Sequence, residues 1–206
     1  MQSKDHWENI YTTKPTDAVG WFQPHADLSL DFIKATGVGR DASIIDVGGG
    51  ASTLVDDLLA DGFTHLSVLD LSAAALTATQ KRLGSAASKV RWFEADITQA
   101  KLPEHQFDVW HDRAVFHFLT SPEDRAAYVQ TVFHAVKPGG HVIVATFAED
   151  GPDKCSGLPV VRYSPDKLHA AFGESFSLLN HKKEAHHTPS GTVQRYIYCY
   201  CRKANA

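Results

Sequence analysis

The sequence is poor in cysteine and has no long apolar run. Three cysteines occur in 206 residues, and Cys199 and Cys201 stand two apart in a strand-like stretch, a spacing that does not favour a disulfide. The longest apolar stretch, near residues 142–148, is interrupted by Thr146 and is too short to cross a bilayer. Residues 1–6 show neither the basic nor the apolar segment of a signal peptide. We therefore expect reduced thiols, no membrane partner and a cytoplasmic location.

The chain also lacks an excess of basic charge and any metal-ligand spacing. Its 20 Lys and Arg residues stand against 24 Asp and Glu residues, so no broad basic field exists to hold a nucleic-acid backbone. Twelve histidines are present, but none is spaced with cysteines as in a zinc finger, and no His-Glu-x-x-His helix occurs. We expect neither a nucleic-acid partner nor a metal site.

The length and the 43% apolar content suit one domain over residues 1–206. No repeat, low-complexity tract or long linker divides the chain. We expect an N-terminal lid and a first helix in 1–39, a ligand-binding core in 40–147, and a substrate-side loop with C-terminal antiparallel strands in 148–206.

Within the core, short apolar runs alternate with helical patterns. Ser72 and Ser121 stand where helix N-caps are expected, and Gly84 stands where a helix should end. Alternation of this kind predicts a parallel, doubly wound sheet with helices on both faces. The expected strands are residues 43–47, 65–69, 90–93, 107–110 and 141–147.

The end of the chain departs from that alternation. A helix is expected over 165–172, followed by two strand-like runs, 175–179 and 194–201, with a turn-rich segment between them. Two successive strands without a helix predict an antiparallel pair. The predicted fold class is therefore α/β: a mostly parallel, seven-stranded sheet with an antiparallel last strand and an N-terminal helical lid.

A glycine-rich turn, Gly48-Gly49-Gly50, follows Asp46 and Val47 at the end of the first strand. Glycines there let the backbone approach a ligand closely, and the next helix presents free amides to an anion. Glycines also serve plain turns, so the turn by itself leaves both readings open. The third glycine of a dinucleotide fingerprint would fall on Thr53, which weakens an oxidoreductase interpretation.

Two further strands end in acidic residues. Asp70 closes the second strand about twenty residues after the glycine turn, where a carboxylate can accept both hydroxyls of a ribose. Asp96 and Ile97 follow the third strand, where an acceptor for an adenine amino group and an apolar wall would complete a pocket. A solvated turn aspartate is the alternative for Asp70.

This ordered set resembles the class I, or seven-strand, S-adenosylmethionine-dependent methyltransferases. The resemblance spans roughly residues 40 to 147, with one departure at the glycine turn, where many relatives have Gly-x-Gly beginning one residue earlier. It implies S-adenosyl-L-methionine as cofactor and S-adenosyl-L-homocysteine as product. The matching segments are 44–50, 68–72, 94–97, 107–112 and 136–140. The implied cofactor contacts are Asp46, Gly48, Gly49 and Gly50 for the amino-acid end, Asp70 and Leu71 for the ribose, Asp96 and Ile97 for the adenine, and His111 and Asp112 beside the methionine part and the methyl group.

The loop after the fourth strand holds the candidates for chemistry. His111 and His117 are the expected catalytic bases, and a structural role is the alternative for each. Arg113 is expected either to hold a substrate anion or to pair with Asp112 or an upstream acid.

Two segments are expected to cover the site. The aromatic opening of the chain resembles the N-terminal lid of small bacterial methyltransferases and of some protein lysine methyltransferases, which implies that Tyr11 and Trp21 cover the cofactor; ordinary core packing is the alternative. In the loop after the fifth strand, Cys155, Arg162 and Tyr163 are expected to bind a small polar acceptor, unless the loop is a plain connection.

The favoured function is methyl transfer to an oxygen, nitrogen or sulfur atom of a small molecule. A protein lysine methyltransferase is the nearest rival, followed by a non-catalytic adenosylmethionine-binding protein and then by an oxidoreductase.

Overall fold

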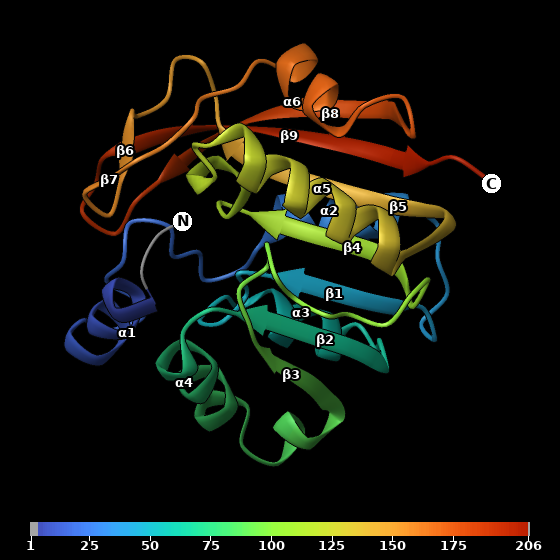
Figure 1. The fold of residues 1–206 in the computed structure, drawn as a ribbon. Coiled ribbons are helices and arrows are strands. Elements are labelled where there is room, and N and C mark those ends of the chain that lie inside the picture. The colour runs from blue at the N-terminus through green and yellow to red at the C-terminus, as the bar shows by residue number, and fades with distance from the viewer. Residues whose placement is uncertain (1–3, 206) are drawn as a thin grey trace.

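In the computed structural model, which describes residues 4–205, one seven-stranded sheet runs through the whole molecule (Figure 1). Residues 1–3 and 206, which the single-domain prediction includes, lie outside the described residues. The strand order is β3-β2-β1-β4-β5-β9-β8. The strands are β1 (Ser43–Val47), β2 (His65–Asp70), β3 (Val90–Glu94), β4 (Phe107–Arg113), β5 (Val136–Phe147), β8 (Phe176–His187) and β9 (Val193–Lys203).

Strand direction follows the prediction. The pairs β1–β2, β2–β3, β1–β4 and β4–β5 are parallel, whereas β9 runs antiparallel to both β5 and β8. The predicted fold class, a mostly parallel seven-stranded sheet with an antiparallel last strand, is confirmed.

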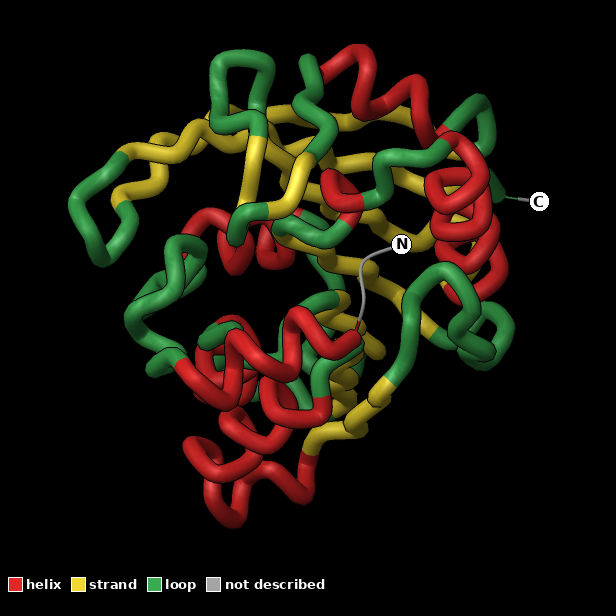
Figure 2. The backbone as a smooth tube through the Cα atoms, turned by 60° about the vertical axis from the view of Figure 1, so that its left-hand side comes forward, coloured by secondary structure: helices red, strands yellow, loops and turns green. Residues whose placement is uncertain are grey.

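Helices cover both faces of the sheet (Figure 2). Val109 and Trp110 are neighbours on β4 and belong to different hydrophobic clusters, because successive strand residues point to opposite faces. One cluster packs under α5 and α6, and the other packs under α2 and α3. The helices are α1 (Lys4–Thr13), α2 (Asp27–Ala35), α3 (Leu54–Ala60), α4 (Ala73–Leu83), α5 (Pro122–Ala135) and α6 (Pro165–Phe172), with short 3-10 turns η1 (Gly84–Lys89) and η2 (Phe116–Phe118). Among the described residues, no helix combines the length and the apolar character needed to cross a membrane.

The helix boundaries follow local capping chemistry. Ser72 Oγ accepts the Ala75 N–H at 3.1 Å and begins α4, and Ser121 Oγ accepts the Asp124 N–H at 3.0 Å and begins α5. Gly84 has a positive φ of 56° directly after α4, where a side chain would be strained.

The two last strands are longer than the apolar pattern predicts. The structure has strands over Phe176–His187 and Val193–Lys203, where 175–179 and 194–201 are predicted. β8 is an edge strand, and its second half carries exposed polar and charged residues that hide the strand from an apolar pattern while the backbone ladder continues. The loop after β5 also forms a small hairpin, β6 (Lys154–Cys155) and β7 (Leu158–Pro159), around a turn in which both central residues have positive φ.

Candidate functional site

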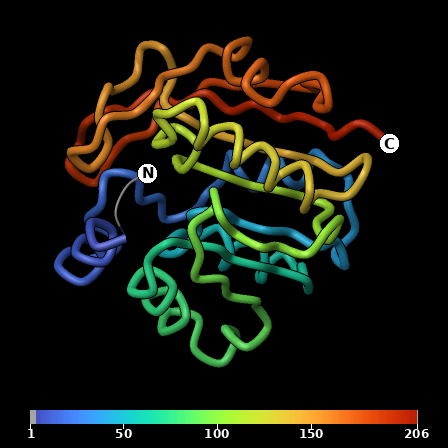
Figure 3. The backbone as a smooth tube through the Cα atoms, viewed as in Figure 1, coloured from blue at the N-terminus to red at the C-terminus, as the bar shows by residue number. Residues whose placement is uncertain are grey.

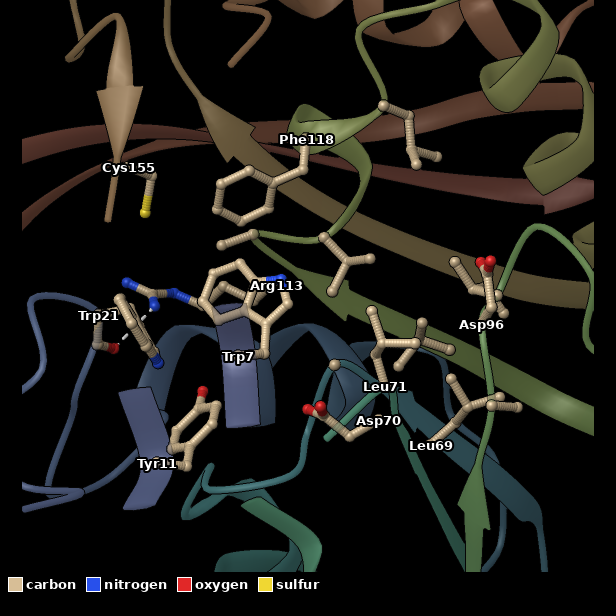
Figure 4. Close-up of a pocket in the computed structure, with 17 residues that line it drawn as sticks. Trp7, Tyr11, Trp21, Leu69, Asp70, Leu71, Asp96, Arg113, Phe118 and Cys155 are labelled. Atoms are coloured by element: carbon tan, nitrogen blue, oxygen red, sulfur yellow. Dashed lines mark hydrogen bonds between the residues drawn. The ribbon is translucent and has the colours of Figure 1, made fainter. Parts of the chain in front are cut away.

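A cavity lies at the carboxyl edge of the sheet, where β1 to β4 end (Figure 4). The strand order reverses between β1 and β4, and doubly wound sheets bind ligands at such a point. The cavity therefore lies where the fold predicts a ligand. It is lined by Trp7, Tyr11, Trp21, Val47, Gly48, Leu69, Asp70, Leu71, Ala95, Asp96, Ile97, Arg113, Ala114, Val115, Phe118, Leu119 and Cys155.

Asp70, the last residue of β2, faces this cavity with two oxygens that are each already hydrogen-bonded. Its side chain accepts the Gly50 N–H at 3.0 Å and the Ser72 N–H at 2.8 Å. Burial raises the pKa of its carboxyl to about 6. Each carboxylate oxygen keeps a further lone pair, so the two oxygens can still accept one hydroxyl each. This is the chemistry that a ribose diol requires.

Asp96, Ile97 and Leu71 line the cavity beside Asp70. Asp96 Oδ1 accepts the N–H and the hydroxyl of Thr98 at 2.9 and 2.8 Å. Its Oδ2 is buried and has no hydrogen-bond partner within residues 4–205. A buried carboxylate oxygen without a partner is costly, and a ligand amino group would satisfy it.

The glycine turn brings backbone close to the ligand space. Gly48 has φ of +71°, and a Cβ there would lie 2.0 Å from the side chain of Val115. A Cβ on Gly50 would lie 2.6 Å from the Asp70 carboxylate. Any larger residue would therefore push against the groups that shape the cavity, which explains the glycines at these two positions.

A second cavity adjoins the first and shares Tyr11, Trp21, Gly48 and Arg113 with it. Its remaining lining includes Asp46, Gly49, Thr53, Ser29 and His111. Asp46 Oδ1 is 2.7 Å from His111 Nδ1, and His111 Nε2 is 2.9 Å from Ser29 Oγ. Asp46 Oδ2 is buried and finds no partner in the described part of the chain.

These features fit an adenosyl amino acid. Asp96 and Asp46 each hold one unsatisfied buried oxygen, and Asp70 stands between them in strand order. The first can accept an adenine amino group, the second an α-amino group, and Asp70 a ribose diol. The match is between these residues' free acceptors and the donors of S-adenosylmethionine.

Aromatic rings from the N-terminal segment cover the cavity. The Trp7 ring lies 5.1 Å from the Phe118 ring and 5.8 Å from the Trp21 ring, and the Tyr11 and Trp21 rings lie 6.2 Å apart, all in edge contacts. We call α1 and the segment 19–23 the lid. Figure 4 shows the Trp7 and Phe118 rings next to one another.

Glu8 fixes the lid to the core. Its carboxylate accepts the N–H of Ala73 at 2.6 Å and of Ala74 at 3.1 Å, at the start of α4. Lys4 forms an ion pair with Glu94 at the end of β3. Figure 3 shows the N-terminal segment beside α4, although the two are far apart in the sequence. A negative charge at a helix N-terminus is favourable, so Glu8 stabilises the closed arrangement.

The other end of the cavity is formed by Arg113 and Cys155. The Arg113 guanidinium donates to Tyr198 Oη at 3.0 Å, to the Trp21 carbonyl at 3.1 Å and to Glu184 Oε2 at 3.1 Å. Burial opposes its charge, but Tyr196, Tyr198 and Glu184 raise the pKa of Arg113 above its ordinary value. The prediction that Arg113 pairs with Asp112 or with an upstream acid is wrong, because its acidic partner is Glu184, seventy-one residues further along the chain.

Cys155 lines the cavity and keeps its proton at neutral pH. Burial raises the pKa of its thiol to about 12, although Arg113 acts in the opposite direction. Figure 4 places its sulfur near the guanidinium of Arg113.

The two candidate histidines are placed differently. His111 lines the second cavity with both ring nitrogens hydrogen-bonded. His117 is fully buried and lines neither cavity; its Nδ1 accepts the Phe147 N–H at 3.2 Å. Burial and the nearby Arg113 lower the pKa of His117 to about 3. The structure does not bring His117 to the reaction space.

Four other predicted contacts also lie outside both cavities, and one of them is Gly50, whose N–H donates to the Asp70 carboxylate. Asp112 faces the opposite side of β4, where its carboxylate accepts from Val115, Phe116 and Tyr128. Arg162 is exposed, and its Nη1 donates to the Gly151 carbonyl at 3.2 Å, whereas Tyr163 packs in the core against Phe116. Successive side chains of a strand point to opposite faces of the sheet, so His111 and Arg113 lie on one face of β4 and Asp112 lies on the other. This alternation explains why Asp112 does not reach the cavities.

Sequence reasoning missed Trp7, Glu8 and Phe118 as named site residues. Trp7 stands four residues before Tyr11, a spacing that places both rings on one face of a helix. Glu8 had no sequence signal, because its partners begin a helix sixty-five residues further on. Within residues 4–205, no three His, Cys, Asp or Glu side chains are arranged to hold a metal ion.

Comparison with known proteins finds chains with a similar sequence and structures with a similar fold. Residues 44–140 match the family described as a methyltransferase domain. An uncharacterised methyltransferase of Mycobacterium bovis is 32% identical over 123 residues, which is 60% of this chain and 58% of that protein. EEF1A lysine methyltransferase 2 of Danio rerio is 27% identical over 160 residues, 71% of this chain and 69% of that protein. The chain thus spans a little over half the length of the mycobacterial relative.

A solved structure with the same fold is that of 1,6-didemethyltoxoflavin-N1-methyltransferase from Burkholderia thailandensis, with bound 1,6-didemethyltoxoflavin and S-adenosylhomocysteine. Its TM-score is 0.69 at 18% identity, and the similarity covers 98% of this chain and 84% of that one. Three observations point to the same family: the domain match, the order of the seven strands, and the free acceptors at the strand ends. Residues 44–140 form a methyltransferase domain similar to those of the class I S-adenosylmethionine-dependent methyltransferases.

Proposed function

We propose that this protein transfers the methyl group of S-adenosylmethionine to a nucleophilic oxygen, nitrogen or sulfur atom of a small molecule. The observation that carries the proposal is one cavity with acidic acceptors at one end, Arg113 and Cys155 at the other, and an aromatic lid above.

Each end of the cavity has a distinct task. Asp96 and Ile97 would hold the adenine, Asp70 with Leu71 the ribose, and Asp46 with the backbone of Gly48, Gly49 and Gly50 the amino-acid end. When bound, the cofactor supplies an electrophilic methyl group on a sulfonium sulfur. The remaining work of the chain is to align a nucleophile with that methyl group and to exclude water.

The lid supports a small acceptor. Trp7 reaches Phe118 across the cavity, with ring centroids 5.1 Å apart, so the rings leave little width for a polypeptide. The structurally similar Burkholderia enzyme is named for 1,6-didemethyltoxoflavin, which is bound in its solved structure.

A protein lysine acceptor is the alternative, favoured by the likeness to EEF1A lysine methyltransferase 2. It would require the lid to open into a channel for a lysine side chain. The two functions therefore make different demands on α1.

We also propose that residues 1–206 act as one domain, with 1–39 as lid and first helix, 40–147 as cofactor core and 148–206 on the acceptor side. A cytoplasmic location fits the buried free thiols of Cys155, Cys199 and Cys201, because oxidising compartments favour disulfides. The formal charge of −4 gives no support to a nucleic-acid acceptor.

Two measurements test the proposal. Calorimetry should show that S-adenosylhomocysteine binds and that NAD does not; the reverse result would remove the cofactor assignment. Methyl-labelled S-adenosylmethionine is then incubated with the protein and a cell extract divided by ultrafiltration. Label in the low-mass fraction supports a small acceptor, whereas label confined to protein supports the lysine alternative.

A further inference from the structure

The acceptor end of the cavity contains a cation and, among its described residues, no base suited to neutral pH. Arg113 stays protonated, burial raises the pKa of Cys155 to about 12, and burial also raises the pKa of Tyr11 far above its ordinary value. Neither predicted histidine lines this cavity: His117 is buried in the core, and His111 lies in the second cavity with both ring nitrogens hydrogen-bonded. A nucleophile that needs deprotonation during the transfer finds no side chain here to accept its proton.

Arg113 has donors to spare. A guanidinium carries five N–H groups, and three bonds are made, to Tyr198, Trp21 and Glu184, so two N–H groups remain. The face of the guanidinium lies over the Tyr196 ring at 4.1 Å, which leaves its edges for further hydrogen bonds. Arg113 lines both cavities.

The neutralising acid stands behind Arg113 and not in the cavity. Glu184 is absent from the lining of both cavities and gives Arg113 one bond, while its other oxygen accepts the Gln23 amide at 2.9 Å. A bidentate pair would have used both oxygens. Arg113 therefore presents positive potential to whatever enters beside Cys155.

The charged and titratable groups that interact with Arg113, together with Tyr11 beside it in the cavity lining, come from five elements. They are Tyr11 of α1, His117 of η2, Cys155 of β6, Glu184 and His186 of β8, and Tyr196 and Tyr198 of β9. The pKa values of His117 and His186 are lowered, first by burial and then by Arg113, and those of the tyrosines and the thiol are raised. Between about pH 7 and 9, none of these histidine, cysteine or tyrosine side chains is placed to change its charge.

We propose that Arg113 binds the acceptor as an anion, and that the acceptor is a small, largely apolar thiol or acidic hydroxyl compound and not an amine. The inference rests on the proposed methyltransferase function and names its substrate class. Trp7, Trp21 and Phe118 supply the apolar walls for the body of such a molecule, and Arg113 supplies the counter-charge for its acidic atom.

The reaction then balances without a protein base. The acceptor loses its proton to solvent as it binds. Its sulfur or oxygen anion forms a bond to the methyl carbon, the bond from that carbon to the sulfonium sulfur breaks, and the electron pair goes to that sulfur. The negative and positive charges cancel, giving a neutral thioether or ether and S-adenosylhomocysteine. An ammonium acceptor would instead face Arg113 as a like charge.

The direct test is a spectroscopic titration without turnover. The protein is saturated with S-adenosylhomocysteine, and 4-nitrothiophenol and 4-nitrophenol are titrated with pH, because their anions absorb visible light. We expect the pKa of the bound probe to fall by roughly 1 to 3 units, the range for an opposite charge at close approach. An unchanged or raised pKa overturns the inference. So does calorimetry in which 4-nitrobenzylamine binds tighter than both probes.

Two variants sharpen this test. Glu184→Gln removes the competing carboxylate and should lower the probe pKa further, whereas an unchanged pKa in the folded variant counts against the inference. Arg113→Lys keeps the charge but loses the planar fork, and should recover only part of the shift. Circular dichroism checks folding, and the wild-type titration decides the matter should either variant fail to fold.

A competing role for Arg113 is to hold the carboxylate of the cofactor, since it also lines the second cavity. S-adenosylhomocysteine has that carboxylate and 5′-methylthioadenosine lacks it. If Arg113→Lys weakens the first more than tenfold and leaves the second unchanged, the acceptor inference is overturned. Failure of wild-type protein to bind S-adenosylhomocysteine would instead refute the proposed function itself.

Discussion

The two ends of the cavity satisfy their buried polar groups in different ways. At the proposed cofactor end, Asp96 and, in the adjoining second cavity, Asp46 each keep one buried oxygen that lacks a partner among residues 4–205. At the acceptor end, Arg113 is tied to three protein groups drawn from the lid, β8 and β9. The first end leaves hydrogen-bond acceptors free for a ligand. At the other end, hydrogen bonds to protein groups fix the orientation of the Arg113 guanidinium.

This difference follows from how the chain builds each end. The cofactor end comes from successive strand ends within residues 46–97, so its geometry is set by neighbouring strands of one sheet. The acceptor end gathers Trp21, Arg113, Cys155 and Glu184 from four distant segments. The first arrangement is local in the sheet, whereas the second exists only after the lid and the last strands have packed.

The largest expected effect breaks the cofactor end. Asp70→Asn replaces a charged acceptor with an amide that can accept through one atom only, and should weaken S-adenosylhomocysteine binding by about 2 to 4 kcal/mol. Calorimetry measures the loss, and Asp41→Asn, an exposed carboxylate elsewhere, is the matched control. Equal affinity in both variants would place the ribose away from Asp70.

The same residue predicts a pH dependence. Because burial raises the pKa of Asp70 to about 6, its charge is lost as pH falls through 6, and cofactor affinity should fall with it. The sign for stability is opposite: a carboxyl with a raised pKa stabilises the unliganded fold below its unfolded pKa, and that contribution is lost as pH rises through about 6. Asp112, raised to about 6 by burial, contributes with the same sign to stability. In Asp70→Asn, which has no carboxyl to titrate at this position, the affinity for S-adenosylhomocysteine measured by calorimetry should no longer fall as pH drops through about 6.

A smaller effect is expected where the chain positions an acceptor indirectly. His111→Phe removes the partner of Asp46 Oδ1 and of Ser29, and should weaken S-adenosylhomocysteine binding by about 1 to 3 kcal/mol. Ser29→Ala removes only the distal bond and should cost less. If both variants bind with wild-type affinity in calorimetry, the amino-acid end does not depend on the orientation of Asp46.

The lid should respond more weakly still. Glu8→Gln keeps one acceptor for the α4 amides but loses the charge, which should destabilise the closed lid by about 0.5 to 1.5 kcal/mol. Trp7 and Trp21 line the cavity, so tryptophan fluorescence can follow the release of S-adenosylhomocysteine. In Glu8→Gln this release should become several-fold faster. Asp5→Asn on the same helix is the control. Equal release rates would show that Glu8 does not hold the lid over the ligand.

Residues within one strand-turn unit were accessible to sequence reasoning, and residues joined across segments were not. The positions of Asp70, Asp96 and Gly48 at the cavity follow from where strands end. Glu184 could not be found, because its half of β8 carries polar residues and reads as a loop although its backbone pairs with β9. Asp112 shows the remaining difficulty: a motif gives the position of a residue, but strand alternation decides which face its side chain enters.

The smallest expected effect concerns His117, and it separates a reaction with a protein base from one without. His117→Asn keeps an acceptor for the Phe147 N–H, so labelled methyl transfer per folded molecule should stay within about twofold of wild type from about pH 5.5 to 8. The reason is that burial lowers the pKa of His117 to about 3, so its ring stays neutral throughout that range. Because its pKa is lower in the fold than in the unfolded chain, His117 stabilises the fold above the unfolded pKa of about 6.5, and this stabilisation is lost as pH falls toward 3. His117→Asn has no such titration, so the variant should lose less stability in acid than wild type does. Exposed His134→Asn provides the control. A turnover loss in His117→Asn with unchanged S-adenosylhomocysteine affinity would make His117 a base and move the reaction space toward η2.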